Sequence, residues 1–349
     1  MRHALIASLV VCLCAVAAAQ VTDKDLLNPD PNDFLLYSGT YDSQRHSPLK
    51  QINTSNIASL QAKWIFHLTG AKDLEAPPIV YKGVMYVGQY NRVHALDAAT
   101  GRLIWEYMRQ PQSVGWQRGI GIYGDMVYMV AQDSALVALD RRSGNPLWEA
   151  RPSLPGKRFQ GPMPFAAKGL IIMSGSGQGG GFIEAFDAKT GALAWRFYMT
   201  PNARGLPDDA ASDKVMKEKA NATWSDGYWR QTGGGGTPWD AITYDPKLDL
   251  VFVGAGNGSP WNHKLRSGGR GDNLFLSSIV ALRPDTGEYV WHFQTTPAED
   301  WDYTATQYMI LADLTIDGRA RKVLMQAPKN DSSMCSIARP ASSSPAHRT

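Results

Sequence analysis

Short apolar stretches alternate with tight turns along most of the chain. Residues 76–88 carry two such stretches around Lys82–Gly83, and residues 122–130 repeat the arrangement around Gly124–Asp125. Residues 248–254 form another stretch of the same kind. Stretches of this length, rich in β-branched and aromatic residues and bounded by glycine-containing turns, are typical of β-strands. The pattern predicts an all-β fold built from many short strands.

One longer pattern recurs: a strand, a turn ending in Thr-Gly, Ser-Gly or a close variant, and a second strand that reaches tryptophan. It occupies residues 95–105, 138–148, 185–195 and 281–291. Aspartate and glycine supply the side-chain hydrogen bond and the positive φ that such turns require. A period of about 40–50 residues with about four strands per unit predicts a β-propeller, with each tryptophan packed between neighbouring sheets. A β-sandwich with chance tryptophan spacing is the alternative, and the joint recurrence of turn and tryptophan disfavours it.

The two ends of the chain differ from this repeat. Residues 1–19 combine a basic start, an apolar stretch and a final Ala-Ala-Ala, which predicts a secretory signal peptide cleaved after Ala19, with an uncleaved anchor as the alternative. Residues 331–349 are rich in Ser, Ala and Pro without any period, which predicts a disordered or frameshifted tail. We therefore expect one partial propeller at 20–330, interrupted by a helical excursion at 205–225.

Composition and charge remove several classes of protein. A hydrophobic share of 44% excludes a disordered chain, and 33 Gly with 11 Trp argue against a coiled coil or helical bundle. The net charge of +3 offers no electrostatic case for nucleic acid. Once the signal peptide is removed, Cys335 is the single cysteine, so the mature chain has no internal disulfide. No Cys/His cluster suggests a zinc site or a haem attachment.

A further series of motifs is more specific than the repeat. It consists of residues 233–240 (GGGGTPWD), 254–262 (GAGNGSPWN), 272–274, 294–297, 301–303 (WDY) and 327–330 (APKN). In this order, and with the repeated tryptophan motif, the series resembles the pyrroloquinoline quinone (PQQ) alcohol dehydrogenases of the methanol/ethanol type, over roughly residues 34–330. The resemblance implies an eight-bladed quinoprotein propeller, of which this chain supplies about four to five blades as an N-terminal fragment.

The resemblance implies a set of cofactor-binding residues. Trp239 matches the tryptophan that forms a floor under the quinone, and Thr237 matches a neighbouring hydrogen-bond donor. Glu75 matches a glutamate of the cofactor pocket, Arg118 an arginine that binds a quinone carboxylate, and Lys329 a basic residue that contacts the quinone oxygens. The alternative for Trp239 is another plug between blades, and for the three charged residues an exposed rim.

The same resemblance implies a calcium site and a catalytic base. Asn257 matches a calcium ligand, and Asp302 matches the base that takes the alcohol proton and also faces the metal. The neighbouring Glu299 and Asp300 are better interpreted as a solvated acidic turn. Gln178 stands where the family has a ligating glutamate, so calcium should bind more weakly here. The adjacent cysteines of the family are also absent, with Gln112 and Ser113 in their place.

The implied function is the oxidation of an alcohol to an aldehyde in the periplasm, with hydride passing to PQQ and electrons to a cytochrome c-type acceptor. A non-catalytic periplasmic propeller that serves as a scaffold is the alternative, since propellers often bind partners without chemistry. A third hypothesis is that the chain is an inactive, truncated fragment. The chain carries no haem motif of its own, and no membrane span is expected after removal of the signal peptide.

Overall fold

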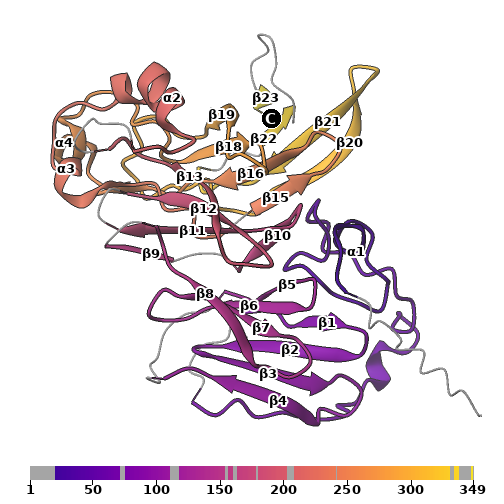
Figure 1. Cartoon of the computed structure of the whole chain (residues 1–349). Coiled ribbons are helices and arrows are strands. Elements are labelled where there is room, and N and C mark those ends of the chain that lie inside the picture. The colour runs from indigo at the N-terminus through magenta and orange to yellow at the C-terminus, as the bar shows by residue number, and fades with distance from the viewer. Residues whose placement is uncertain are drawn as a thin grey trace, which may run out of the picture.

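The computed structural model describes residues 20–70, 75–110, 118–153, 156–159, 163–177, 180–202, 208–240 and 242–330, and the strand backbone at 334–337 and 347–348. Within these residues, five antiparallel sheets of at least four strands follow one another along the chain (Figure 1). Each sheet is a simple meander in which neighbouring strands are also consecutive or nearly consecutive in sequence. The prediction of a partial β-propeller with four to five blades is confirmed.

The strands divide among the blades as follows. The first blade holds β1 (Ile79–Tyr81), β2 (Val84–Gln89), β3 (Arg92–Asp97) and β4 (Leu103–Met108). The second holds β5 (Gly121–Tyr123), β6 (Met126–Val130), β7 (Leu136–Asp140) and β8 (Pro146–Ala150). The third holds β10 (Phe165–Ala167), β11 (Leu170–Gly177), β12 (Phe182–Asp187) and β13 (Leu193–Tyr198), with β9 (Lys157–Phe159) paired to the end of β11.

The fourth blade holds β15 (Ile242–Asp245), β16 (Leu250–Gly254), β18 (Ser278–Leu282) and β19 (Tyr289–Gln294). The fifth holds β20 (Ile310–Ile316), β21 (Arg319–Gln326), β22 (Met334–Ile337) and β23 (His347–Arg348). A short ribbon of β14 (Gly234–Gly235) and β17 (Gly258–Ser259) lies outside the blades. The strands β22 and β23 fall within the predicted tail, and the predicted signal peptide lies outside the described residues.

Helical elements are short and lie before or between the strands. They are α1 (Asp23–Leu27), η1 (Ile57–Ser59), α2 (Asp213–Val215), η2 (Met216–Ala220), η3 (Asn221–Thr223), α3 (Trp229–Thr232) and α4 (His263–Ser267). The elements α2, η2 and η3 lie in the stretch where the sequence predicts a helical excursion. In the part of the chain that the structure describes, no helix is long and apolar enough to cross a membrane.

The recurring tryptophan packs against the turn between the third and fourth strands of the first four blades. A Cβ atom placed on the turn glycine would lie 2.5–2.6 Å from the indole ring in the pairs Gly101–Trp64, Gly144–Trp105, Gly191–Trp148 and Gly287–Trp195. Each of these glycines has a φ between +69° and +74°, a region that other residues rarely adopt. The indole N–H of Trp105 donates to the carbonyl of Arg141 at 3.1 Å, on the same turn as Gly144. The predicted role of tryptophan between the sheets is therefore confirmed.

The segment before the first blade contacts all five blades. Val21 forms an isolated bridge with Gly124 of the second blade, and Phe34 forms one with Val80 of the first. The buried hydroxyl of Tyr41 donates to the carbonyl of Ala166 in the third blade at 2.9 Å. Backbone hydrogen bonds connect residues 41 and 42 to the fourth and fifth blades. One extended segment thus fills the space between inner strands that are far apart in sequence.

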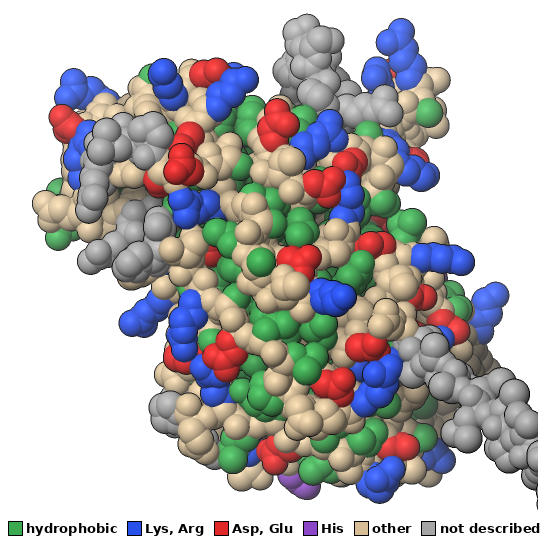
Figure 2. Space-filling model, in the orientation of Figure 1, with side chains coloured by type: hydrophobic (Ala, Val, Ile, Leu, Met, Phe, Trp, Pro, Cys, Tyr) green, Lys and Arg blue, Asp and Glu red, His purple; other side chains and the backbone are tan. Residues whose placement is uncertain are grey.

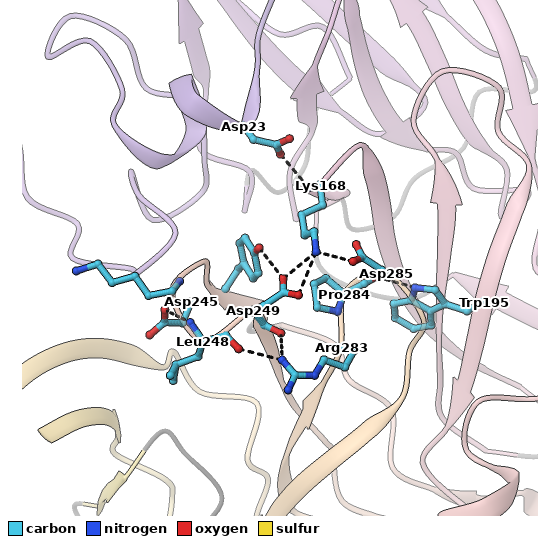
Figure 3. Close-up of polar contacts among 11 residues, drawn as sticks. Asp23, Lys168, Trp195, Asp245, Leu248, Asp249, Arg283, Pro284 and Asp285 are labelled. Carbon is cyan, nitrogen blue, oxygen red and sulfur yellow. Dashed lines mark hydrogen bonds and ion pairs between the residues drawn. The ribbon is translucent and has the colours of Figure 1, made fainter.

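Charged side chains reinforce the contact between the third and fourth blades (Figure 3). The Lys168 ammonium lies 3.0 Å from Oδ1 of Asp249 and 2.5 Å from Oδ2 of Asp285, and the Lys168 backbone N–H donates to Asp23 Oδ1 at 2.8 Å. Arg283 donates to the carbonyls of residues 248 and 249 beside this group. Figure 2 shows acidic and basic side chains interspersed over one face, in keeping with the small net charge.

Candidate functional site

The predicted site residues come from two positions within the blades. Glu75, Arg118 and Trp239 precede the first strand of the first, second and fourth blades by three or four residues. Asn257 and Lys329 follow the second strand of the fourth and fifth blades by three residues. The first two strands of each blade are antiparallel, so the start of one lies beside the end of the other. Both positions therefore fall on the same edge of their blades.

Glycine-rich backbone brings two of these positions into contact. The segment with β14 leads to Thr237, and the segment with β17 contains Asn257. The N–H of Gly236 donates to the carbonyl of Asn257 at 2.8 Å, and a Cβ at Gly256 would lie 2.5 Å from the Thr237 carbonyl oxygen. Side chains at these glycines would separate the two backbones, which explains the glycine run that the sequence shows.

The predicted floor, Trp239, lies against Arg118, which in turn pairs with Glu75. The guanidinium carbon of Arg118 is 4.9 Å from the centroid of the Trp239 ring. Nη1 of Arg118 is 3.2 Å from Oε2 of Glu75. A planar cation stacked on an indole face and held by a carboxylate is a favourable arrangement. The structure thus unites three residues that are separated by 43 and 121 positions in the sequence.

Asp240 belongs to this group although the sequence analysis did not select it as a site residue. Burial raises the pKa of Asp240 to about 6, although Arg118, Arg45 and a hydrogen bond from Tyr308 favour its charged form. The Arg45 guanidinium carbon lies 3.7 Å from the centroid of the Tyr308 ring. Arg118, Asp240 and Tyr308 line a cavity of about 30 Å³. Asp240 was visible at the end of the motif GGGGTPWD, whereas no local pattern indicated Arg45 or Tyr308.

Asp302 and Lys329 form a second group on the same edge. Nζ of Lys329 is 3.6 Å from Oδ2 of Asp302, and both side chains are partly exposed. Asp302 has a φ of +59°, in the left-handed region that disfavours residues other than glycine. An exposed carboxylate held beside an ammonium is available to a solute, as a proton acceptor must be.

The interpretation of Glu299 as a solvated acid is wrong. Its side chain is fully buried, with 0% of the residue exposed. Oε1 accepts the backbone N–H of Trp301 at 2.6 Å and of Tyr303 at 2.9 Å, and Oε2 accepts the N–H of Gly258 at 3.2 Å. These three donors replace water around the carboxylate, which is why an acid can be buried there. The neighbouring Asp300 is exposed, as the sequence suggested.

A buried arginine lies behind this carboxylate. Arg266 is fully buried, and burial lowers its pKa. Its Nη1 donates to the carbonyls of Pro260 and Trp261 at 2.8 and 2.7 Å, its Nε to Asn273 at 2.8 Å, and its Nη2 to the carbonyl of Glu299. The sequence analysis did not select Arg266, because an arginine outside any motif is usually a surface residue.

The predicted metal ligands are only partly described. Asn257 is half-buried and donates from Nδ2 to the carbonyl of Gly258 at 3.1 Å. Gln178 lies outside the described residues, as do Gln112 and Ser113. Among the residues that the structure describes, no three His, Cys, Asp or Glu side chains are grouped so that they could hold a metal ion.

Comparison with known proteins identifies the family of the chain. Residues 35–149 and 162–333 match the family described as "PQQ: Glucose/ethanol/alcohol dehydrogenase, beta-propeller domain". The chain is 44% identical over 321 residues to the dehydrogenase subunit of a quinone alcohol dehydrogenase from Gluconobacter oxydans, covering 86% of this chain and 42% of that protein. It is 46% identical over 314 residues to quinohemoprotein alcohol dehydrogenase ADH IIB from Pseudomonas putida, covering 85% and 44%.

A solved structure shows the same likeness in three dimensions. The crystal structure of quinohemoprotein alcohol dehydrogenase from Comamonas testosteroni superposes with a TM-score of 0.83 at 38% identity, covering 93% of this chain and 50% of that one. The chain thus spans about half the length of these relatives. The family match covers nearly the whole propeller, and the resemblance inferred from the motifs is confirmed. This chain belongs to the family of PQQ-dependent glucose/ethanol/alcohol dehydrogenase β-propellers.

Proposed function

We propose that this chain forms the PQQ-binding part of a dehydrogenase that oxidises an alcohol to an aldehyde. The observation that carries the proposal is the group formed by Glu75, Arg118, Trp239 and Asp240, which joins three blades at one edge. Relatives at 44–46% identity are named quinone or quinohemoprotein alcohol dehydrogenases. The chain covers 42% and 44% of the length of those two relatives. The proposed activity therefore depends on the contacts among these four residues as well as on the relatives' names.

The residues of the site suit a flat, negatively charged cofactor. The face of Trp239 already accepts a planar group, because the Arg118 guanidinium lies over it. Arg118 and Lys329 supply positive charge for the carboxylates and carbonyl oxygens of PQQ, and Thr237 can donate a hydrogen bond. When bound, PQQ supplies a carbon that accepts hydride from the alcohol. We expect Glu75 to orient Arg118 through their ion pair.

The proposed proton acceptor is Asp302. Its carboxylate takes the hydroxyl proton of the alcohol at Oδ, and the ion pair with Lys329, 3.6 Å away, helps to hold the carboxylate in place. The Trp301 side chain, 74% exposed and stacked with Tyr303 at 6.4 Å, lies beside it and could shield the reacting groups from water.

Calcium remains a prediction of the resemblance. Ca²⁺ takes six to eight oxygen ligands, usually with several carboxylates. Asn257 and Asp302 are the predicted ligands within the described residues, and Lys329 already pairs with Asp302. These two side chains do not by themselves make a calcium site, so the proposed roles of the residues above do not depend on the metal.

Location and partners follow the family resemblance. We propose a periplasmic protein, exported by the signal peptide predicted at 1–19, that acts on a small alcohol and passes electrons to a cytochrome c-type acceptor. The competing proposal is a scaffold propeller without chemistry. The group of Glu75, Arg118 and Trp239 favours the dehydrogenase. A scaffold does not require a guanidinium held over an indole ring at the edge of the blades, whereas a site for a flat anionic cofactor does.

Cofactor binding is tested first. We expect PQQ to quench the tryptophan fluorescence of the purified full chain in a saturable way, and we expect Trp239→Ala to weaken binding at least ten-fold. Trp261→Ala, which removes an exposed tryptophan of the neighbouring motif, is the matched control and should bind like the wild type. Equal PQQ affinity in the wild type and Trp239→Ala would contradict the proposed floor.

Turnover is tested separately. Reduction of an artificial dye by the PQQ-loaded chain with short primary alcohols, with and without added Ca²⁺, should be abolished in Asp302→Asn while PQQ binding persists. PQQ binding without any turnover would identify an inactive fragment, and the absence of both would favour the scaffold.

A further inference from the structure

We propose that Glu299 is a positioning residue that holds the loop carrying Asp302 against the loop carrying Asn257. The inference rests on the proposed function for the role of Asp302, whereas the contacts themselves do not depend on it. Glu299 is fully buried, so it cannot touch a substrate and must act through the backbone that it binds. We call Glu299 and its three N–H partners, Gly258, Trp301 and Tyr303, the Glu299 clamp.

One carboxylate oxygen of Glu299 binds the backbone on both sides of Asp302, the proposed base. Oε1 of Glu299 accepts the N–H groups of Trp301 and Tyr303, the residues immediately before and after Asp302. Two hydrogen bonds to one carboxylate oxygen fix the backbone on both sides of Asp302. That residue has a φ of +59°, an unfavourable conformation that persists only where neighbouring contacts enforce it. The clamp supplies such contacts, and charge-assisted hydrogen bonds are among the stronger ones in proteins.

The other oxygen reaches the loop of the predicted metal ligand. Oε2 accepts the N–H of Gly258, which directly follows Asn257. This second loop follows β16, and Gly258 lies 41 residues before Glu299 in the chain. A single carboxylate therefore sets the position of Asp302 relative to Asn257, although their sequence motifs are independent.

Arg266 gives the clamp a rigid backing. Its Nη2 donates to the backbone carbonyl of Glu299, and a Cβ added at Gly258 would lie 2.1 Å from its Nη1. The close approach of Gly258 to the guanidinium explains why this position is glycine. The exposed Asp300, next to Glu299, instead accepts the N–H of His263 and takes no part in the clamp, which makes it a suitable control.

The first test measures hydrogen exchange at the clamped amides of the full chain. In Glu299→Ala, exchange at Gly258, Trp301 and Tyr303 should accelerate at least ten-fold. In Glu299→Gln, the amide group keeps one oxygen acceptor but presents an N–H₂ donor in place of the other. We therefore expect one of the two loops to lose protection in Glu299→Gln while the other keeps it.

Asp300→Asn should leave all three amides as protected as in the wild type. If Glu299→Ala does not fold, Glu299→Gln alone decides the matter, because it preserves size and shape. Unchanged exchange at all three amides in a folded Glu299 variant would overturn the clamp.

The second test asks whether the clamp serves the proposed reaction. With PQQ bound, Glu299→Gln should lower kcat for alcohol oxidation at least ten-fold, while the affinity for PQQ and the KM for the alcohol change less than three-fold. A general loss of structure would lower PQQ affinity as well. Equal kcat in Glu299→Gln and the wild type would overturn the positioning role. A wild-type chain that neither binds PQQ nor turns over would overturn the proposed function, and the exchange experiment would still decide whether the clamp exists.

Discussion

Individual residues of the site owe their properties to burial rather than to their local sequence. Asp240 ends one motif of the site and Glu299 lies between two others. Asp240 sits beside two arginines and has a raised pKa, whereas Glu299 is surrounded by three backbone donors. Asp302, three positions after Glu299, stays partly exposed beside Lys329. Three carboxylates of similar ordinary pKa are thus given different roles by what surrounds them.

Asp240 provides a prediction about pH and stability. Its pKa of about 6 in the folded chain exceeds the ordinary value of 3.8, so the folded state holds a proton between these values that the unfolded state releases. The contribution of Asp240 to the stability of the wild type therefore falls as pH rises from about 4 to 6, and the cost persists above pH 6.

Replacement of Asp240 removes this cost. Asp240→Asn should be more stable than the wild type by about 1–2 kcal/mol at pH 7 and nearly equal at pH 4. Urea unfolding of both proteins at pH 4, 5, 6 and 7 measures the difference. A difference that does not vary with pH would show that Asp240 is not the group with the raised pKa.

At the scale of elements, the turn between the third and fourth strands acts as the socket for a tryptophan in the first four blades. The tryptophan comes from the preceding blade in the second to fourth blades, and from the segment before the blades, as Trp64, in the first. The glycine of the turn serves two purposes, because its positive φ closes the turn and its missing side chain admits the ring. This explains why glycine and tryptophan recur together in the sequence with one period. The repeat therefore specifies the packing between neighbouring blades as well as the strands within each blade.

Two glycines separate these two purposes experimentally. Gly191 has a φ of +73° and a built Cβ 2.6 Å from the Trp148 ring, whereas Gly169 has a φ of +75° with nothing within 4 Å. Gly169→Ala should cost about 1 kcal/mol of stability from the backbone alone. Gly191→Ala should cost about 2–4 kcal/mol, because the collision is added to the same strain. Chemical unfolding measures both, and equal losses would mean that the turn does not act as a socket.

At the scale of the whole molecule, the segment before the first blade holds the inner strands together. This segment contacts all five blades, so its loss should lower the stability of the whole propeller and not of one sheet alone. Tyr41 is its best-buried aromatic residue, packed against Phe165 and, edge to face, against Tyr244.

Tyr41 tests this role. Tyr41→Ala removes the ring and should cost about 3–5 kcal/mol, while Tyr41→Phe removes only the hydrogen bond to Ala166 and should cost about 1 kcal/mol. Unfolding followed by tryptophan fluorescence gives both values. If Tyr41→Ala were as stable as Tyr41→Phe, the segment would contribute little packing at the centre.

The motifs selected residues that lie together in the structure, and the roles of these residues toward a cofactor stay predictions. Arg118 contacts Trp239 and Glu75, and each of the three precedes the first strand of its blade. Lys329, which follows the second strand of its blade, pairs with Asp302. Residues that serve the site from outside these positions were not predicted. Arg45 comes from the segment before the blades, and Arg266 from an insertion, and neither has a periodic or motif context.

The sequence by itself determined the strands, the blade period, the tryptophan sockets and the family, because these depend on local patterns that repeat along the chain. The tertiary structure decided which acids are buried, which arginines they meet and how the first segment joins the blades. Burial and charge depend on neighbours that are distant in sequence and near in space, so no local pattern encodes them. Glu299 shows the difference most clearly: its sequence suggests a solvated turn, and its three backbone partners make it a buried support for Asp302.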